Sequence, residues 1–501
     1  MKLQRSKYQL CFLIVLCLTA SLIPGSVIAK DSSDPEQLVE INSMVKDVME
    51  KSRIPSAAIA MVRGAEIEYL SFGFEDESNH VKINEQSLFQ LGSTTKAFTG
   101  LGILLLEDEG KLSLSDPVSS YIPWFTATYQ GETIAAEDLT IADCLYQTTG
   151  YTNDERKYPS ATAEMTLAEN IRNLSNRELA SAPGQQFSYA NTNYNLLGLI
   201  IETVAKQDYQ SFMKERILQP MGLIHTDCYT NEVKESKVLV PGRKLSFGNT
   251  YLLETPAIEG LVPSGYMISN TSDMGRWLQI QMGIIEISPQ FTRIIEKSHI
   301  ANPASVVDEK TCYASGWFID DLNGVIYHSG GTPNYSTKIA MKFSDGIGVC
   351  VLTNLNASAN TNYLADNILL MLEDKETTPY QHDIWFIIDT IFSTITFICT
   401  LLTCFLIVRL IVISRQIKNN DRKKTPINRK RLIGNIIPGL LLIITAAVIV
   451  VLPTIFKSDW LAMWLWAPVS LYCGIFMLSV FSLLLLITTI IISKYPLQTS
   501  A

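Results

Sequence analysis

Three long apolar runs occupy the C-terminal part of the 501-residue chain, and each is long enough to cross a lipid bilayer. They predict transmembrane helices over residues 384–413, 432–455 and 461–492. Residues 414–431, between the first and second helices, are rich in Lys and Arg, whereas only Lys457-Ser-Asp separates the second from the third. Because basic loops stay in the cytoplasm, this pattern predicts that the chain before the first helix lies outside the cell.

A shorter apolar run follows three basic residues at the N-terminus. It extends from about Leu10 to Ile23 and leads to small residues suited to cleavage after Ala29. A spanning helix needs about 20 apolar residues, so a signal peptide over 1–29 is favoured, with an uncleaved anchor as the alternative. Both interpretations agree with the loop charges and predict an exported domain over residues 30–383.

Within the exported domain, strand patterns at both ends flank a mostly helical middle. An amphipathic helix over 36–52 leads to a hairpin over 56–76. The region from about 115 to 310 is mostly helical, and short strands return over 313–354 before a closing helix near 359–373. We therefore predict an α+β domain, in which one antiparallel sheet is assembled from both ends of the domain and packs against a helical subdomain.

Charge and cysteine content narrow the functional classes. A net charge of −9 and an acidic pI argue against nucleic acid as a partner. The exported domain has no Cys-x-x-Cys pair, so we predict no metal and no cofactor. Disulfides are permitted outside the cell but cannot be assigned, and buried thiols are the simpler expectation for Cys144, Cys228, Cys312 and Cys350. Asp389, inside the first apolar run, is expected at the outer membrane boundary.

A Ser-x-x-Lys pattern occurs three times, beginning at Ser43, Ser93 and Ser211. The first and third lie in polar amphipathic helices, where both side chains would face solvent. Only Ser93 follows a glycine at a predicted helix start and precedes a buried continuation, so Lys96 shares its face. A cation is unfavourable in the first turn of a helix, and burial would lower the Lys96 pKa toward that of a base. The alternative is a tolerated surface lysine.

Tyr-x-Asn is also repeated, beginning at Tyr151, Tyr189 and Tyr229. Tyr189 and Asn191 lie on a turn before an apolar helix, where a phenol could relay a proton if a neighbouring ammonium lowered its pKa. Tyr151 follows Thr-Thr-Gly in a loop and is a candidate lining residue, and Tyr229 is expected in a solvent-facing loop.

His328-Ser329-Gly330-Gly331 occurs once, on a predicted strand. The two glycines leave the backbone open to a ligand, and a strand N–H there could pair with that of Ser93 to hold an oxyanion. The alternative is a strand that ends in a glycine turn, capped by His328.

Taken in this order, the motifs "STTK", "YAN" and "HSG" resemble the active site of serine β-lactamases and penicillin-binding proteins, in the variant of class C enzymes, DD-peptidases and related esterases. The segments "LTIADCLYQTTGYT" and "PGQQFSYANTNYNLLGLIIE" resemble that family too. The resemblance covers residues 38–375 and implies a β-lactamase/transpeptidase-like fold. The three C-terminal helices resemble those of the membrane-bound FmtA-like proteins of Gram-positive bacteria.

The resemblance implies a role for each candidate. Ser93 would be the nucleophile and would form an acyl-enzyme, while Lys96 and Tyr189 would transfer its proton. The N–H groups of Ser93 and Gly331 would form the oxyanion hole. Asn191 would bind the amide of the acyl side chain, and Tyr151 would line the cleft.

Two further roles follow, with one departure from the family pattern. His328 would take the place of the family's usual Lys, and Ser329, beside Gly330, would bind the substrate carboxylate. A neutral His binds a carboxylate less strongly, which favours a peptidase or esterase over a dedicated β-lactamase. We expect a membrane-anchored hydrolase that acts on D-alanyl bonds of a Gram-positive cell envelope. The alternatives are a penicillin-binding sensor with low turnover and a class C-type β-lactamase; the oligomeric state stays open.

Overall fold

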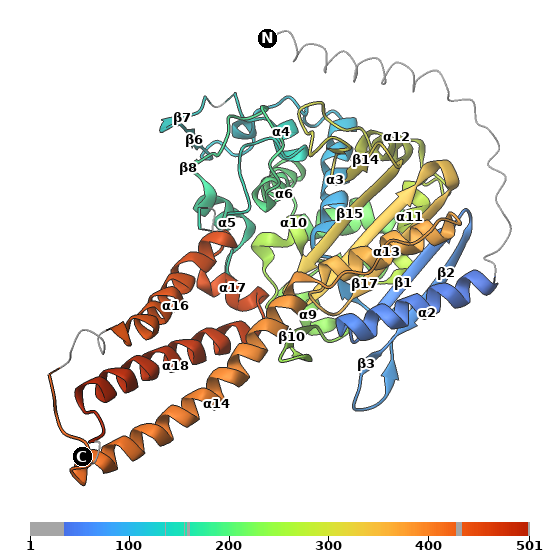
Figure 1. The fold of residues 1–501 in the computed structure, drawn as a ribbon. Coiled ribbons are helices and arrows are strands. Elements are labelled where there is room, and N and C mark those ends of the chain that lie inside the picture. The colour runs from blue at the N-terminus through green and yellow to red at the C-terminus, as the bar shows by residue number, and fades with distance from the viewer. Residues whose placement is uncertain (1–34, 136, 155, 158–160, 427–432, 499–501) are drawn as a thin grey trace. The chain divides into compact units, whose positions relative to one another are not determined.

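The computed structural model describes residues 35–498, except 136, 155, 158–160 and 427–432. The signal peptide predicted over 1–29 lies outside the described residues. The sequence from residue 35 folds into the predicted α+β domain, which is followed by the apolar C-terminal helices (Figure 1).

A seven-stranded antiparallel sheet forms the centre of the domain. Its order is β13-β14-β15-β16-β17-β1-β2, so the first and last strands of the domain are neighbours. β1 pairs with β17, with Ala57 opposite Thr353, which confirms that both ends of the domain build one sheet. The strands are β1 (Ala57–Arg63), β2 (Glu66–Phe72), β13 (Thr311–Tyr313), β14 (Phe318–Asp320), β15 (Val325–Thr332), β16 (Tyr335–Lys342) and β17 (Ile347–Thr353).

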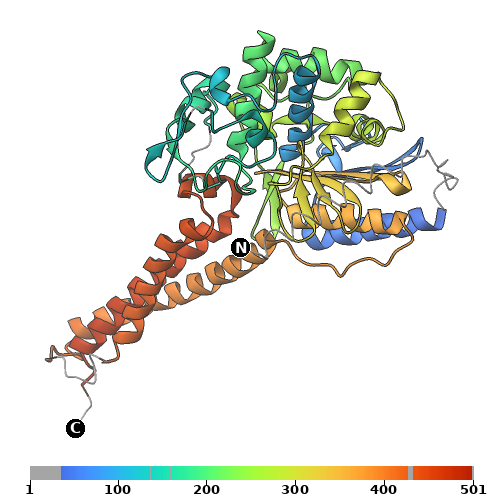
Figure 2. The same ribbon diagram turned by 90° about the horizontal axis from the view of Figure 1, so that it is seen from above.

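Helices bury both faces of this sheet (Figure 2). α2 (Pro35–Ser52) and α13 (Ser358–Leu372) cover one face, and α3 (Thr95–Asp108) and α11 (Thr271–Gln281) cover the other. Successive side chains of β1 alternate between the two cores, as the period of a strand requires. The helices predicted at either end of the domain are therefore confirmed.

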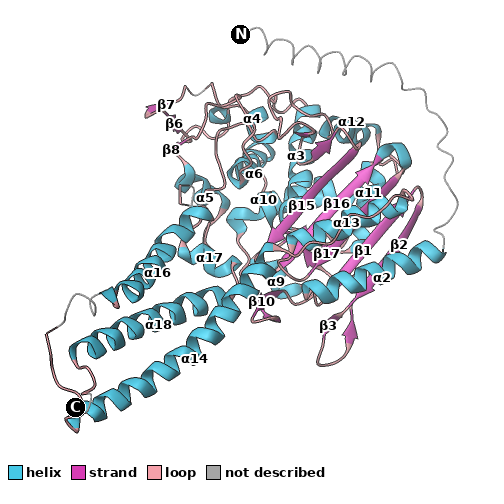
Figure 3. Cartoon of the chain, in the orientation of Figure 1, coloured by secondary structure: helices cyan, strands magenta, loops and turns pink. Residues whose placement is uncertain are grey.

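The middle of the domain is helical, with short strands that the sequence pattern did not predict (Figure 3). These strands have two to four residues, too few to show a period of two. The helices are α4 (Ile141–Leu145), α5 (Leu167–Leu174), α6 (Asn191–Ala205), α7 (Tyr209–Met213), α8 (Gln219–Met221), α9 (Asn231–Ser236), α10 (Val262–Gly265) and α12 (Pro289–Ser298). The strands are β3 (Phe74–Asp76), β4 (Val81–Lys82), β5 (Phe89–Gln90), β6 (Ala127–Tyr129), β7 (Glu132–Thr133), β8 (Arg177–Glu178), β9 (Asp227–Cys228), β10 (Arg243–Ser246), β11 (Asn249–Leu252) and β12 (Met267–Ser269).

Three C-terminal helices are long and apolar enough to cross a membrane: α14 (Ile384–Lys418), α16 (Ile436–Ile455) and α18 (Val469–Lys494). The single helix expected over 461–492 is instead two, because a short α17 (Trp460–Trp466) precedes α18. The residue before a proline is disfavoured in a helix, and Ala467, before Pro468, is extended with φ −80° and ψ 149°.

Candidate active site

Ser93 lies in a short 3-10 turn, η1 (Gly92–Thr94), that leads directly into α3. The α-helix begins at Thr95, two residues after the predicted start. Gly92 has a φ of +55°, and a Cβ built on it would lie 2.5 Å from the backbone nitrogen of Gly331 in β15. Only glycine fits this approach, so it allows η1 to hold Ser93 against the strand.

Lys96 lies in the first turn of α3 and is 0 % exposed. Its Nζ lies 3.0 Å from Ser93 Oγ, 2.8 Å from Asn191 Oδ1 and 2.6 Å from the carbonyl oxygen of Ser264. Burial lowers the pKa of the Lys96 amine well below its usual value.

A neutral Lys96 amine matches these three neighbours. It has two hydrogens to donate and one lone pair, whereas the ammonium has three hydrogens and no lone pair. In the neutral form, with the oxygens of Asn191 and Ser264 accepting its two hydrogens, the amine turns its lone pair toward the Ser93 hydroxyl, whereas the ammonium donates to all three oxygens. The arrangement can therefore accept the proton of Ser93, which accounts for a lysine at a helix end that disfavours cations.

Tyr189 reaches the same hydroxyl from the segment before α6. Its phenol shares a hydrogen bond with the Ser93 side chain, and its ring centroid lies 4.9 Å from Lys96 Nζ. Burial, followed by the neighbouring Tyr313, raises the pKa of Tyr189 well above its usual value. The hypothesis that a nearby ammonium lowers this pKa is wrong, because desolvation dominates and also disfavours the charge on Lys96.

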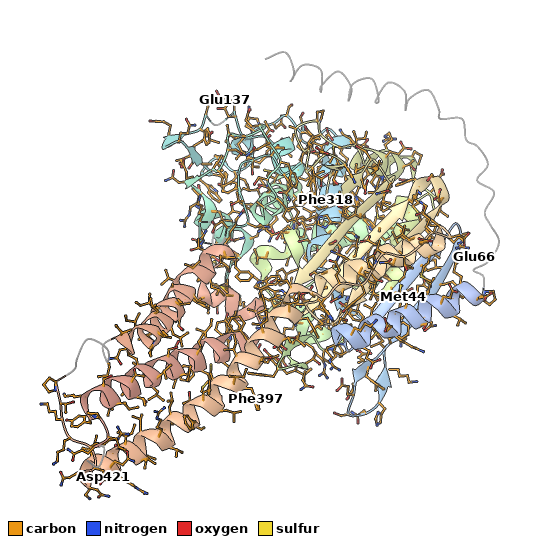
Figure 4. The ribbon with its side chains drawn as sticks, in the orientation of Figure 1. Met44, Glu66, Glu137, Phe318, Phe397 and Asp421 are labelled. Carbon is orange, nitrogen blue, oxygen red and sulfur yellow. The ribbon has the colours of Figure 1, made fainter. Side chains whose placement is uncertain are left out.

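Aromatic side chains from the sheet hold the Tyr189 ring. Phe318 of β14, labelled in Figure 4, stacks on it with a centroid separation of 6.1 Å and an interplanar angle of 16°. Tyr313 of β13 meets it edge to face at 6.2 Å. The predicted strand over 313–320 is split between these two rings, because Gly316 turns the chain with a φ of +86°.

The backbone nitrogens of Ser93 and Gly331 both lie where η1 and β15 approach each other most closely. A Cβ built on Gly330 would lie 3.0 Å from the backbone nitrogen of Ser93, while one on Gly92 would lie 2.5 Å from that of Gly331. β14 pairs only with Val325–Tyr327 of β15, so among the described strands none pairs with residues 328–332 on that side. A substrate carbonyl oxygen could accept both N–H groups at this free edge.

His328 is buried beneath the same strand, at 1 % exposure. Its Nδ1 lies 2.7 Å from the carbonyl oxygen of Ser329, and its Nε2 lies 3.4 Å from the Tyr313 hydroxyl. Burial is the main cause that lowers the pKa of His328 to about 3. The imidazole is therefore neutral at physiological pH, and the partly exposed Ser329 is the polar side chain left on this part of the strand.

The residues of the Tyr-x-Asn patterns take different places around the site. Asn191 binds Lys96 through its side-chain oxygen, at the start of α6. Tyr151 does not line the cleft: it is fully buried and its hydroxyl donates to the carbonyl of Leu174. Asn153, two residues later, instead accepts a hydrogen bond from the Asn191 backbone at 3.0 Å.

Two groups at the site have no signal in the sequence. The Ser264 carbonyl that binds Lys96 is a backbone atom, which every residue carries. Tyr313, which contacts both Tyr189 and His328, lies in a strand pattern where an aromatic residue is ordinary. Cys144, Cys228 and Cys350 are buried thiols, as expected, and Cys312 is partly exposed.

Two relatives from Gram-positive bacteria show what the chain is similar to in sequence. The chain is 33% identical over 332 residues to the protein flp of Staphylococcus aureus (strain MRSA252), a match that covers 65% of this chain and 64% of flp. The chain thus spans less than two thirds of the length of flp. It is 24% identical over 347 residues to PbpX of Bacillus subtilis (strain 168), which covers 69% of this chain and 82% of PbpX.

Solved structures share the fold. The octameric penicillin-binding protein homologue from Pyrococcus abyssi matches with a TM-score of 0.57 and 25% identity, over 71% of this chain and 81% of that chain. D-alanine carboxypeptidase AmpC from Burkholderia cenocepacia matches with a TM-score of 0.55 and 21% identity, over 67% of this chain and 98% of that chain, a likeness of fold alone. Since the Beta-lactamase family model matches residues 41–373, the chain belongs to the β-lactamase family and has its serine hydrolase fold.

Proposed function

We propose that the protein is a membrane-anchored, extracytoplasmic serine hydrolase that cleaves D-alanyl peptide or ester bonds of a Gram-positive cell envelope. The observation that carries this proposal is the fully buried Lys96, whose Nζ lies 3.0 Å from Ser93 Oγ and within hydrogen-bonding distance of the oxygens of Asn191 and Ser264. A lysine held in this way serves a nucleophile.

Acylation follows from these contacts. Ser93 Oγ forms a bond to the carbonyl carbon while its proton passes to Lys96 Nζ. The carbonyl oxygen becomes an oxyanion that the N–H groups of Ser93 and Gly331 stabilise. When the bond to the leaving nitrogen or oxygen breaks, the proton on Lys96 is delivered to that atom, with the Tyr189 hydroxyl between them. The high pKa of Tyr189 keeps the phenol protonated for this role.

Hydrolysis of the acyl-enzyme repeats the sequence with water. A water oxygen bonds to the carbonyl carbon and gives its proton to Lys96. The ester bond to Ser93 Oγ then breaks, and the proton returns to Ser93. The same lysine and phenol therefore serve both half-reactions.

The neutral His328 favours a substrate without a free carboxylate next to the scissile bond. A lysine at this position would bind a carboxylate through its charge, whereas an imidazole with a pKa of about 3 offers no charge. An alanyl ester does not require a charged residue on this strand to bind a carboxylate. We therefore rank D-alanyl esters above β-lactams as substrates.

The proposed topology rests on the C-terminal helices. The catalytic domain precedes α14, whose last turn carries Arg415 and Lys418 and leads into the basic segment 414–431. Basic segments stay in the cytoplasm, so the domain at the other end of α14 lies outside. α14, α16 and α18 then hold the domain at the membrane.

Mass spectrometry of the full-length protein tests the proposal. After exposure to a D-alanyl ester or to penicillin, we expect an acyl adduct on Ser93, which is released with time for the ester. Ser93→Ala should abolish the adduct. Ser43→Ala is the matched control, since it alters another Ser-x-x-Lys pattern in α2 and should leave the adduct unchanged. An adduct that persists in Ser93→Ala would contradict the proposal.

A second pair of variants tests the proton path. Tyr189→Phe should slow turnover of the ester about 100-fold or more, in line with the loss of a general acid–base group. Tyr229→Phe, from another Tyr-x-Asn pattern, should turn over normally. Equal rates in the two variants would remove Tyr189 from the mechanism.

A further inference from the structure

The short helix α17, which links two membrane helices, reaches the active-site strand. A Cβ built on Gly331 would lie 3.9 Å from Cζ3 of Trp466 and 3.2 Å from Oγ of Ser358. A side chain at position 331 would thus touch the indole of Trp466, so this ring faces the residue whose N–H is proposed to hold the oxyanion across a space of one side-chain atom. Trp466 is partly exposed, so part of its ring remains available to a bound molecule.

Polar contacts on both sides of Trp466 hold α17 against the catalytic domain. The buried Lys244 of β10 donates from Nζ to the carbonyl oxygen of Trp464 at 2.5 Å. After α17 ends, the backbone nitrogen of Ser470 donates to Oγ of Ser246 at 3.0 Å. These two anchors, on one strand of the domain, bracket Trp466 in sequence.

A buried carboxylate fixes the same joint from the first membrane helix. Asp389 of α14 is 1 % exposed and accepts hydrogen bonds from the backbone nitrogens of Phe247 and Gly248, at 2.8 and 2.7 Å. It also accepts the hydroxyl of Ser470. The Asp389 carboxylate thus joins the β10–β11 turn, α14 and α18. Hydrogen bonds to a carboxylate are stronger than those between neutral groups. Beyond its expected position at the outer membrane boundary, Asp389 therefore links α14 to the catalytic domain.

The contacts made by Lys244, Ser246 and Asp389 place the free edge of β15 near the outer surface of the membrane. Trp466 lies three residues before α18 begins, which is at most about 10 Å for an extended chain. On α17, Leu461, Trp464 and Leu465 are exposed, and such aromatic and apolar side chains are typical of the membrane–water interface. A substrate carbonyl bound at Gly331 consequently lies close to the lipid headgroups.

We propose that Trp466 is a substrate-binding residue, and that the site takes D-alanyl groups carried on molecules anchored in the outer leaflet of the membrane. The indole packs against the carrier next to the scissile ester, on the side of Gly331. This inference rests on the proposed D-alanyl hydrolase function and deepens it by naming the class of carrier.

Proteoliposomes with the full-length protein test this proposal. One probe is phosphatidylglycerol esterified with D-alanine in the vesicle membrane, and the other is the D-alanyl ester of soluble glycerol phosphate. We expect kcat/KM for the lipid probe to exceed that for the soluble probe, and to fall about tenfold in Trp466→Ala, the loss of one well-packed aromatic contact. Trp466→Phe, which keeps a ring, should recover part of this loss.

Two controls separate the possible failures. Trp464→Ala removes a neighbouring exposed indole and should leave turnover of both probes unchanged. The rate at which a small fluorophosphonate labels Ser93 should change less than about twofold in Trp466→Ala, which shows that the site is folded. Equal turnover of both probes, or an unaffected Trp466→Ala, would overturn the inference while leaving the hydrolase function intact. Failure of the wild-type protein to label or turn over would overturn both.

Discussion

Gly330 has no room for a side chain, which makes it a sharp test of the oxyanion geometry. A Cβ built there would lie 2.0 Å from the carbonyl oxygen of Leu91, 2.4 Å from Oγ1 of Thr337 and 3.0 Å from the backbone nitrogen of Ser93. The Leu91 carbonyl also accepts a hydrogen bond from Thr337 at 2.6 Å. Gly330→Ala must therefore push the segment that carries Ser93 away from β15 by about 1 Å to reach ordinary contact distances.

A displacement of this size should cost catalysis far more than stability. Oxyanion donors act at about 2.7–3.1 Å, and the loss of one typically slows the reaction about 10²–10³-fold. Overpacking a core costs about 1–3 kcal/mol of unfolding free energy, so the variant should still fold. The assay is the rate at which a fluorophosphonate labels Ser93, measured beside the melting temperature of the same preparation.

The matched control is Gly348→Ala on β17 of the same sheet. Its added Cβ would meet only the side-chain ends of Leu278 and Met282, at 3.2 Å, and these can move aside. Gly348→Ala should therefore label at the wild-type rate. If Gly330→Ala also labelled within about threefold of wild type, the Gly330 side of the strand would not shape the oxyanion site, and this reasoning would be refuted.

Three other perturbations have defined outcomes. Lys96→Met should abolish labelling of Ser93 yet raise the melting temperature by about 2 °C, because a desolvated amine costs folding energy; a fall in that temperature would contradict the burial argument. Burial lowers the pKa of His299 to about 3, whereas an unfolded His titrates near 6.5, so the unfolded chain binds more protons between these values. This residue's share of the unfolding free energy should drop by about 2.5 kcal/mol between about pH 7 and pH 4.5, and His299→Asn should flatten the measured pH dependence of unfolding by that amount. Asp389→Ala leaves two backbone amides of the β10–β11 turn without their acceptor, so their hydrogen exchange, followed by mass spectrometry, should accelerate about tenfold or more, and unchanged protection would argue against the joint.

Local patterns in the sequence were sufficient for the sheet and for several of the residues that the fold brings together around Ser93. Strand periodicity at residues 57–72 and 325–353 predicted the two halves of the sheet, and a glycine before Ser93 with an apolar helix after it singled out one Ser-x-x-Lys pattern among three. The Tyr-x-Asn pattern was less informative, because Tyr151 and Tyr189 both follow turns, and only the fold directs one phenol to Ser93 and the other into a core. The pKa of Tyr189 likewise depends on neighbours from distant strands.

The apolar C-terminal segment shows most clearly what local patterns omit. A hydropathy profile averages the side chains of one segment and ignores their tertiary partners. From it, Asp389 is only a charged residue near the end of an apolar run. Its partners are backbone N–H groups of a turn that lies 141 and 142 residues earlier in the chain, and no side-chain pattern marks them. Trp466 likewise reads as one more aromatic residue of the third apolar run until the break at Pro468 and the anchors on β10 place it beside Gly331. Three helices are more than anchoring requires, but they are what brings α17 back to the active-site strand, which gives the C-terminal segment a role in substrate selection.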